Sequence, residues 1–184
     1  MTILTALFTA LIAAGSFIKV PVGAVPVTLQ TLFVFMAGLL LPPASATFSV
    51  FIFIVLGLIG LPIFTSGGGI AAFVSPTGGF IIGFLAAAIA GSLLARKKHD
   101  SVLYNVFVVL VMEIITYLIG LPWLKINLST TWAKAFAVGL VPFIPGDAIK
   151  IAVAAISSRI LYPEVQKLSS KLNEREKSEE DTEE

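Results

Sequence analysis

The residues best suited to polar chemistry are Asp147 and Lys150, in the segment Pro145-Gly146-Asp147-Ala148-Ile149-Lys150. Proline suits the first turn of a helix and an acid is favoured there by the helix dipole, so the pair at i and i+3 shares one helix face. Ionisable residues in apolar segments usually mark a substrate or ion path. The carboxylate can accept N–H bonds, and the ammonium can meet an oxygen of a small polar ligand. The alternative is an intrahelical ion pair that only neutralises itself.

Two glycine-rich segments offer a second kind of polar surface. Residues 65–69 read Thr-Ser-Gly-Gly-Gly and residues 75–79 read Ser-Pro-Thr-Gly-Gly. Glycine lets backbone donors approach a ligand without a Cβ in the way, so these segments could form a pocket wall; flexible turns are the alternative. They are no phosphate loop, because no Lys-Ser or Lys-Thr follows at the required spacing.

Glu113 and a stripe of alanines are further features of the apolar segments. Glu113 lies midway along one of them, where a charge is costly, and we interpret it as a structural polar contact, with proton coupling as the alternative. Ala6, Ala10 and Ala14 recur every fourth residue and predict a smooth helix surface for close docking. The stripe could serve a separate subunit or packing within the same bundle.

The elements that position these residues are membrane helices. The chain has 184 residues, of which 57% are hydrophobic and 12% are charged. This composition predicts an all-α integral membrane protein. Six apolar segments are candidates for transmembrane helices: residues 1–19, 26–41, 44–64, 76–95, 101–121 and 146–162.

Charge placement predicts the orientation. The basic loop at 96–100 belongs in the cytoplasm by the positive-inside rule, which places both termini there as well. The connections near residues 20–26, 62–75 and 122–145 then lie outside and hold most of the proline and glycine, so a concave site is expected at that face. Residues 1–163 form the predicted six-helix substrate-binding domain. Residues 164–184, with eight acids and four bases, form a predicted disordered cytoplasmic tail.

Four motifs in this order resemble the BioY family, the biotin-specific substrate-binding (S) components of energy-coupling factor (ECF) transporters. The resemblance covers residues 2–163. The motifs are Val25-Pro26-Val27-Thr28-Leu29-Gln30-Thr31, Gly57-Leu58-Ile59-Gly60-Leu61-Pro62-Ile63-Phe64, Ser75-Pro76-Thr77-Gly78-Gly79-Phe80 and Pro142-Phe143-Ile144-Pro145-Gly146-Asp147-Ala148-Ile149-Lys150. One departure is Phe80, where tyrosine is expected in many relatives.

The resemblance implies high-affinity biotin binding at the outer face and uptake across the bacterial or archaeal cytoplasmic membrane. It implies that Asp147 and Lys150 contact biotin, and that the alanine stripe docks onto a transmembrane coupling subunit, which works with two ATP-binding cassette ATPases. The full predicted set of biotin contacts is Asp147, Lys150, Thr65, Ser66, Gly68, Thr77, Gly78, Gly79, Phe80 and Gln30.

Other functional classes fit less well. No Walker motif is present, so ATP would be used only by partner subunits, and the alternative is a stand-alone biotin secondary transporter or facilitator. An enzyme is not expected, because one histidine and scattered acids provide no catalytic set. We expect no cofactor, no bound metal and no nucleic-acid partner; the expected partners are biotin, the lipid bilayer and the ECF subunits.

Overall fold

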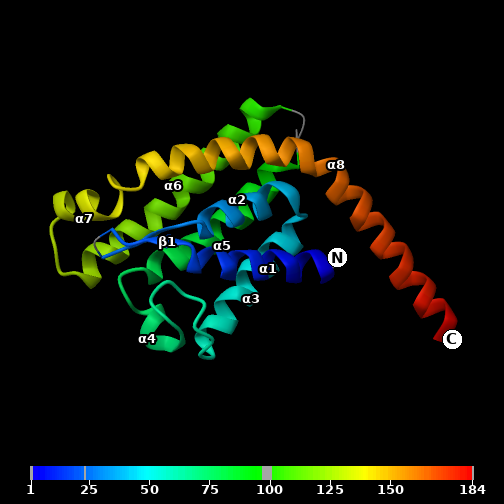
Figure 1. The fold of residues 1–184 in the computed structure, drawn as a ribbon, viewed down its shortest axis with the longest axis horizontal. Helices are drawn as coiled ribbons and strands as arrows, with labels where there is room; N and C mark the ends of the chain where they lie inside the picture. Colours follow the sequence, from blue (N-terminus) through cyan, green and yellow to red (C-terminus); the bar gives the residue numbers. More distant parts are fainter. Residues whose placement is uncertain (1, 23, 97–100, 184) are drawn as a thin grey trace.

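The computed structural model describes residues 2–22, 24–96 and 101–183, with side chains described as far as residue 172. Figure 1 shows a mostly helical molecule with one small hairpin. Its elements in chain order are α1 (Thr2–Phe17), β1 (Lys19–Val20), β2 (Val27–Thr28), α2 (Gln30–Leu40), α3 (Pro43–Leu58), α4 (Gly69–Phe73), α5 (Gly78–Ala95), α6 (Val102–Asn127), α7 (Trp132–Gly139) and α8 (Ile144–Glu183). The six segments predicted as helices correspond to α1, α2, α3, α5, α6 and α8.

Two of these helices, α5 and α6, are long and apolar enough to cross a membrane in the part of the chain that the structure describes. The bent pair of α7 and α8, with 52° between its halves, could form a third span. The other apolar helices, α1, α2 and α3, are shorter. At a rise of about 1.5 Å per residue, the 11 residues of α2 extend only about 16 Å, against a hydrocarbon core of about 30 Å.

The start of the second predicted helix is instead the second strand of a short antiparallel hairpin. Val20 pairs with Val27 and Lys19 with Thr28, so the chain is not purely α-helical. The physical reason is local: the residue before Pro26 is pushed towards extended backbone, and the β-branched Val27 and Thr28 favour a strand. The helix then begins only at Gln30, and it ends before Pro42 and Pro43 as predicted.

The third helix also differs from its predicted range, because α3 ends at Leu58 rather than near residue 64. Gly60 has a φ of 112° and follows the helix end in the left-handed conformation. The N–H of Gly60 bonds to the carbonyl of Gly57, and that of Leu61 bonds to Leu56. This pattern is a Schellman motif, which satisfies the last carbonyls of the helix and turns the chain away.

The fifth predicted helix was placed at residues 101–121, yet α6 continues through Pro122 as far as Asn127. A proline inside a helix removes one N–H and usually ends or kinks it. Here the following turn is fixed by other contacts: Trp123 Nε1 donates to the carbonyl of Ser75 at 2.9 Å, and the side chain of Leu124 is fully buried. Tertiary contacts therefore override the local signal.

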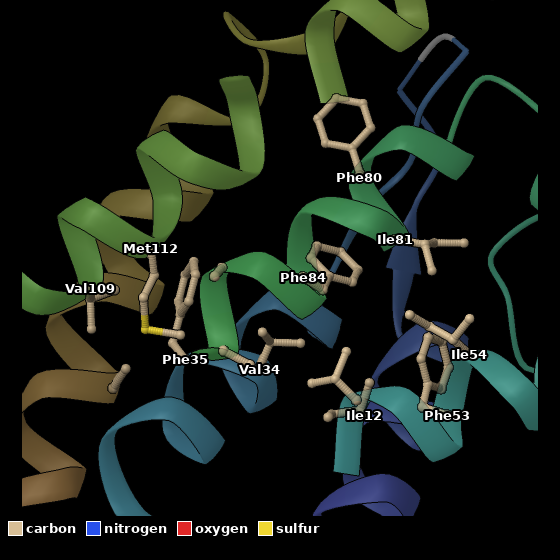
Figure 2. Packing of buried hydrophobic residues seen from close by; sticks show 14 of the residues in the cluster. Ile12, Val34, Phe35, Phe53, Ile54, Phe80, Ile81, Phe84, Val109 and Met112 are labelled. Carbon is tan, nitrogen blue, oxygen red and sulfur yellow. The ribbon is translucent and has the colours of Figure 1, made fainter. Parts of the chain in front are cut away.

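The buried core lies between α5 and the helices around it. α5 packs against α6, α2 and α3, while α8 packs against α2 and α6. Figure 2 shows Met112 of α6 reaching towards Phe35 of α2, and Ile12 of α1 lying close to Phe53 of α3. All four side chains have exposed fractions of 0%. This packing fixes the positions of α5, α6 and α8 relative to one another.

The backbones of α5 and α6 approach each other closely at Gly83. A Cβ added there would lie 3.0 Å from the Cα and the carbonyl oxygen of Thr116, so the missing side chain lets the two backbones pack at this distance. The contact aligns Thr116 and its neighbours on α6 with the start of α5.

The backbone of α8 is helical through Pro163 as far as Glu183. The predicted disorder of the charged segment stays a prediction. Glu and Lys are strong helix formers, and Lys167 pairs with Glu164 at 2.9 Å across one turn. Figure 1 shows this part of α8 extending away from the other helices. The domain boundary at residue 163 and the cytoplasmic placement of both termini remain predictions.

Candidate functional site

A cavity opens where the hairpin, α2, α5, α6 and α8 meet. Its free volume is about 40 Å³. Six of the ten predicted contact residues line it, although they come from four distant stretches of the sequence: Gln30, Thr65, Thr77, Phe80, Asp147 and Lys150. The fold therefore brings most of the predicted set together around one space.

The Asp147–Lys150 pair is the charged centre of this cavity. Lys150 Nζ lies 3.0 Å from Asp147 Oδ1, and both residues are buried, with exposed fractions of 5% and 6%. Lys150 also donates to Thr31 Oγ1 at 2.9 Å. The phenol of Tyr117 donates to Asp147 Oδ2 at 2.5 Å. The pair is thus held between α2 and α6 rather than being confined to its own helix.

Two further polar side chains of the cavity have atoms left unpaired. Gln30 Nε2 and Glu113 Oε2 are buried without a hydrogen-bond partner among the described residues. Glu113 lies close enough to Asp147 and Tyr117 to interact with both electrostatically. Glu113 is therefore part of the cavity wall. Its interpretation as a structural polar contact, with proton coupling as the alternative, stays a prediction.

Thr65 and Thr77 reach the cavity from the segment between α3 and α5, and Ser66 supports them from behind. Ser66 Oγ lies 3.1 Å from Ser75 Oγ, which lies 2.9 Å from Thr77 Oγ1. Ser66 also donates to the carbonyl of Ala72 at 3.1 Å. This hydroxyl chain positions Thr77, so the structure places Ser66 one layer behind the cavity lining.

The three predicted glycine contacts are not part of the lining. A Cβ added at Gly68 would lie 2.4 Å from the carbonyl oxygen of Leu61, and one at Gly78 would lie 1.7 Å from that of Phe73. At Gly79 it would lie 2.2 Å from Trp123 Cβ. These glycines permit close packing of the segment between α3 and α5, and of α5 against α6. Their assignment as ligand contacts stays a prediction that their positions do not favour.

Apolar side chains complete the cavity. Phe80 and Phe84 come from α5, Val25 precedes β2, and Phe143 precedes α8. Phe80 packs edge-on against the ring of Tyr117, with 6.1 Å between the ring centroids. An apolar wall beside a few convergent polar groups is typical of a small-molecule site.

Several lining residues were missed by sequence reasoning, and one signal could have found three of them. Glu113, Thr116 and Tyr117 are separated by three and four positions in an apolar helix, so they share one polar face of α6. Thr31 and Phe143 lay inside quoted motifs but were not selected. No group of three or more acidic, histidine or cysteine residues in the described part of the chain could hold a metal ion.

The alanine stripe lies on the outer surface of α1. Ala6, Ala10 and Ala14 are exposed, whereas Phe8 and Ile12 on the other side of the helix are buried in the bundle. The stripe therefore does not pack within this chain, which was one of its two interpretations. A groove of about 370 Å³ between α1 and α3 lies next to Ala6.

Comparison with known proteins identifies the family. The BioY family model matches residues 1–167. The biotin transporter BioY of Thermotoga maritima is 40% identical, over 88% of this chain and 95% of that protein. A probable biotin transporter BioY of Pyrococcus horikoshii is 41% identical, over 83% of this chain and 90% of that protein. A crystal structure of the S-component for biotin from an ECF-type ABC transporter matches with a TM-score of 0.80 and 35% identity, over 87% of this chain and 89% of that one.

Proposed function

Because this chain belongs to the BioY family, we propose that it binds biotin and mediates its uptake as the S component of an ECF-type transporter. It is a multi-pass membrane protein of a bacterial or archaeal membrane, and it is not an enzyme. The observation that carries the proposal is the buried Asp147–Lys150 pair in a cavity whose Gln30 and Glu113 keep unpaired polar atoms.

The chemistry of the cavity suits biotin. The ligand offers two ureido N–H donors, one ureido carbonyl, an apolar bicyclic ring and a carboxylate chain. Asp147 supplies an acceptor and Lys150 a donor, and the aromatic walls at Phe80 and Phe84 supply apolar surface. A buried pair that is already anchored by Thr31 and Tyr117 offers a ligand preorganised partners, which lowers the entropy cost of binding.

Entry of the ligand requires the cavity to widen. Its free volume of about 40 Å³ is well below the roughly 300 Å³ or more of typical small-molecule pockets. We propose that the hairpin β1–β2 and the stretch between α3 and α4 move to admit the ligand, since both contribute residues to the cavity lining and neither is a membrane-length helix. Lys19 Nζ bonds to the carbonyl of Thr65 at 3.0 Å and links these two segments.

The arrangement in the membrane and the partners follow from the same proposal. Six crossings, both termini in the cytoplasm and the cavity open to the outside would let the protein capture biotin outside the cell. A coupling subunit and two ATP-binding cassette ATPases would supply the energy. The exposed stripe of Ala6, Ala10 and Ala14 supports α1 as the docking surface, because small residues let helices approach closely.

Biotin titration by calorimetry on the detergent-purified protein tests the binding role. Asp147→Asn should weaken binding about tenfold to a hundredfold, because a charge-assisted hydrogen bond contributes roughly 1.5–3 kcal/mol. Lys150→Ala should cost at least as much, since it leaves Asp147 partly unpaired. The matched control is Lys167→Ala, which breaks an exposed pair of the same i,i+3 spacing in the same helix and should leave affinity unchanged.

Two outcomes would contradict the proposal. One is wild-type protein that neither binds added biotin nor carries any after purification, as measured by mass spectrometry of its small-molecule extract. The other is a double variant, Asp147→Asn with Lys150→Met, that keeps near-normal affinity. Uptake that persists in cells lacking the coupling subunit would instead favour a stand-alone transporter.

A further inference from the structure

An apolar groove lies between α6 and α7, which pack against each other. Figure 1 shows α7 beside the C-terminal end of α6. The free volume of the groove is about 440 Å³, within the range of roughly 300–1,000 Å³ that holds small molecules. Its lining includes Ile114, Leu118 and Leu121 of α6 and Trp132 and Phe136 of α7. Leu118 is 68% exposed, so the groove is open to the lipid around a membrane protein.

The groove follows one stripe of α6 that ends at a cation. Ile114, Leu118 and Leu121 are spaced by four and three positions, so they share one face of the helix. Lys125 follows four positions later and continues that face. At about 1.5 Å per residue, the stripe from Ile114 to Lys125 is about 16 Å long, close to half of the roughly 30 Å hydrocarbon core. The groove therefore has the length of one lipid leaflet.

The end of this stripe has the side chains of a membrane interface. Lys125 lies in the last turn of α6, and its Nζ is 5.3 Å from the centre of the Trp132 ring. Tryptophan is enriched at the level of the lipid head groups, and lysines near helix ends extend towards the same level. Lys125 is therefore placed to meet the head group of a lipid whose chain lies in the groove.

The charge of this part of the chain favours an anionic lipid. Residues 114–146 contain two bases, Lys125 and Lys134, and no acid. The acids on either side of this stretch, Glu113 and Asp147, line the cavity instead. Within a bilayer, exchanging one acyl chain for another brings no hydrophobic gain, so the head group decides which lipid binds. A second copy of the chain fits less well, because a two-fold contact through this face would bring bases against bases.

Tyr117 connects the groove with the cavity, because its side chain lines both. Its hydroxyl donates to Asp147 Oδ2 at 2.5 Å. A chain packed in the groove would keep the ring from turning away from Asp147. We propose that one anionic phospholipid occupies the groove, with an acyl chain against Tyr117 and its phosphate at Lys125, and that it holds the Tyr117 hydroxyl on Asp147. The effect on biotin rests on the proposed function, whereas the binding of lipid does not.

Lipid retention tests the site directly. The protein is reconstituted into vesicles of equimolar phosphatidylglycerol and phosphatidylcholine with identical acyl chains, extracted in mild detergent and measured by native mass spectrometry. The wild type should retain one phosphatidylglycerol about fivefold more often than phosphatidylcholine, the factor expected for one lysine near an anionic head group. Lys125→Gln should lose this preference. Lys125→Arg should keep it, because the positive charge is kept.

The matched control for the charge is Lys134→Gln. Lys134 is two positions from both Trp132 and Phe136, so it lies on nearly the opposite face of α7. Its replacement removes the same charge from the same part of the chain without touching the groove. The preference for phosphatidylglycerol should therefore stay unchanged.

A groove-filling variant tests the acyl chain separately. Leu118→Trp places an indole in the groove and should displace the lipid whatever its head group. Leu110→Trp carries the same substitution at another exposed position of α6, outside the groove lining, and should retain the lipid. Thermal unfolding checks that each variant is folded, and the Lys125 variants keep the test decisive if Leu118→Trp is not.

Biotin titration in the two lipids tests the link through Tyr117. The wild type should bind biotin about fivefold more tightly in phosphatidylglycerol nanodiscs than in phosphatidylcholine nanodiscs, at the low end of the usual coupling between two sites. By linkage, saturating biotin should raise the preference for phosphatidylglycerol by the same factor. Lys125→Gln, outside the cavity lining, should bind biotin equally in both lipids. Tyr117→Phe should keep the lipid preference and lose the difference in biotin affinity, because its ring remains and its hydroxyl does not.

The lipid site is overturned if the wild type retains the two lipids equally, or if Lys134→Gln loses the preference as Lys125→Gln does. It is also overturned if Leu118→Trp breaks a dimer seen by mass spectrometry, since a second copy would then occupy the groove. Retention of phosphatidylglycerol without any change in biotin affinity overturns the link through Tyr117. Failure of the proposed function gives a different result, because biotin would bind in neither lipid while lipid retention stayed as measured.

Discussion

The phenol of Tyr117 on α6 donates a hydrogen bond to Asp147 on α8, with 2.5 Å between the phenol oxygen and Oδ2. This bond leaves Asp147 Oδ1 to Lys150 and fixes the plane of the carboxylate at the cavity. It joins two helices that also pack against each other. Tyr117 therefore determines how the carboxylate presents itself to a ligand.

Removing that hydroxyl tests its role. Tyr117→Phe should weaken biotin binding about tenfold, because Asp147 loses a bond of roughly 1.5 kcal/mol and its carboxylate becomes free to rotate. Calorimetric titration measures the change. Tyr104→Phe is the matched control, since Tyr104 donates to the carbonyl of Leu94 away from the cavity and should leave affinity unaltered. Equal affinities of Tyr117→Phe and the wild type would show that the bond does not orient the site.

A glycine variant distinguishes helix packing from ligand contact at Gly79. An added Cβ would lie 2.2 Å from Trp123 Cβ, so Gly79→Ala must push α5 and α6 apart. We expect a loss of about 1–3 kcal/mol in the free energy of unfolding, as for other overpacked sites. Biotin affinity should fall only through the displacement of neighbouring Phe80. A thermal unfolding curve with biotin titration separates the effects, and loss of affinity at unchanged stability would restore Gly79 as a direct contact.

The sequence predicted the helices well because hydrophobic length is a strong local signal, and it predicted the polar pair because charge is rare in an apolar segment. It did not predict the hairpin at Val27 or the passage of α6 through Pro122, since both depend on contacts with distant residues. The glycines show a further constraint that the sequence does not reveal. Gly78 and Gly79 stay predicted ligand contacts, and the structure adds that a Cβ at either position would meet Phe73 or Trp123.

The residues of the candidate site were also only partly predictable from the sequence. Asp147, Lys150 and Gln30 could be selected because they lie in motifs that resemble a known family. Tyr117 and Glu113 lie on α6, outside those motifs; their spacing marks a polar face, but their contact with Asp147 depends on the packing of α8 against that helix. The spacing of residues within one helix does not show which residue of another helix each of them contacts. The unpaired state of Glu113 Oε2 could be read only from the folded arrangement.

The alanine stripe offers a test of partner docking that spares the cavity. Ala10→Trp places a large side chain on the exposed face of α1 and should block close helix approach. Biotin affinity should stay within about twofold of the wild type, because additive behaviour is expected for distant sites. Uptake and copurification with a coupling subunit should both fail. Leu110→Trp, on an exposed position of α6, is the control and should leave both intact; equal failure of the two variants would remove the special role of α1.

The orientation of the protein is testable with single cysteines, since the natural sequence has none. Lys134 on α7 is exposed and follows the C-terminal end of α6, whereas Ser101 precedes α6 at the other end of that helix. If the basic loop before α6 is cytoplasmic, an impermeant thiol reagent added to intact cells should label Lys134→Cys and not Ser101→Cys. Permeabilised cells should be labelled in both variants, which controls for accessibility.

Ser101 accepts a hydrogen bond from the N–H of Tyr104 and caps α6, so its replacement should cost about 0.5–2 kcal/mol in the free energy of unfolding. Expression of the variant is therefore measured first. Labelling of Ser101→Cys in intact cells would reverse the topology and place the cavity mouth on the cytoplasmic side, where it could not capture biotin from outside.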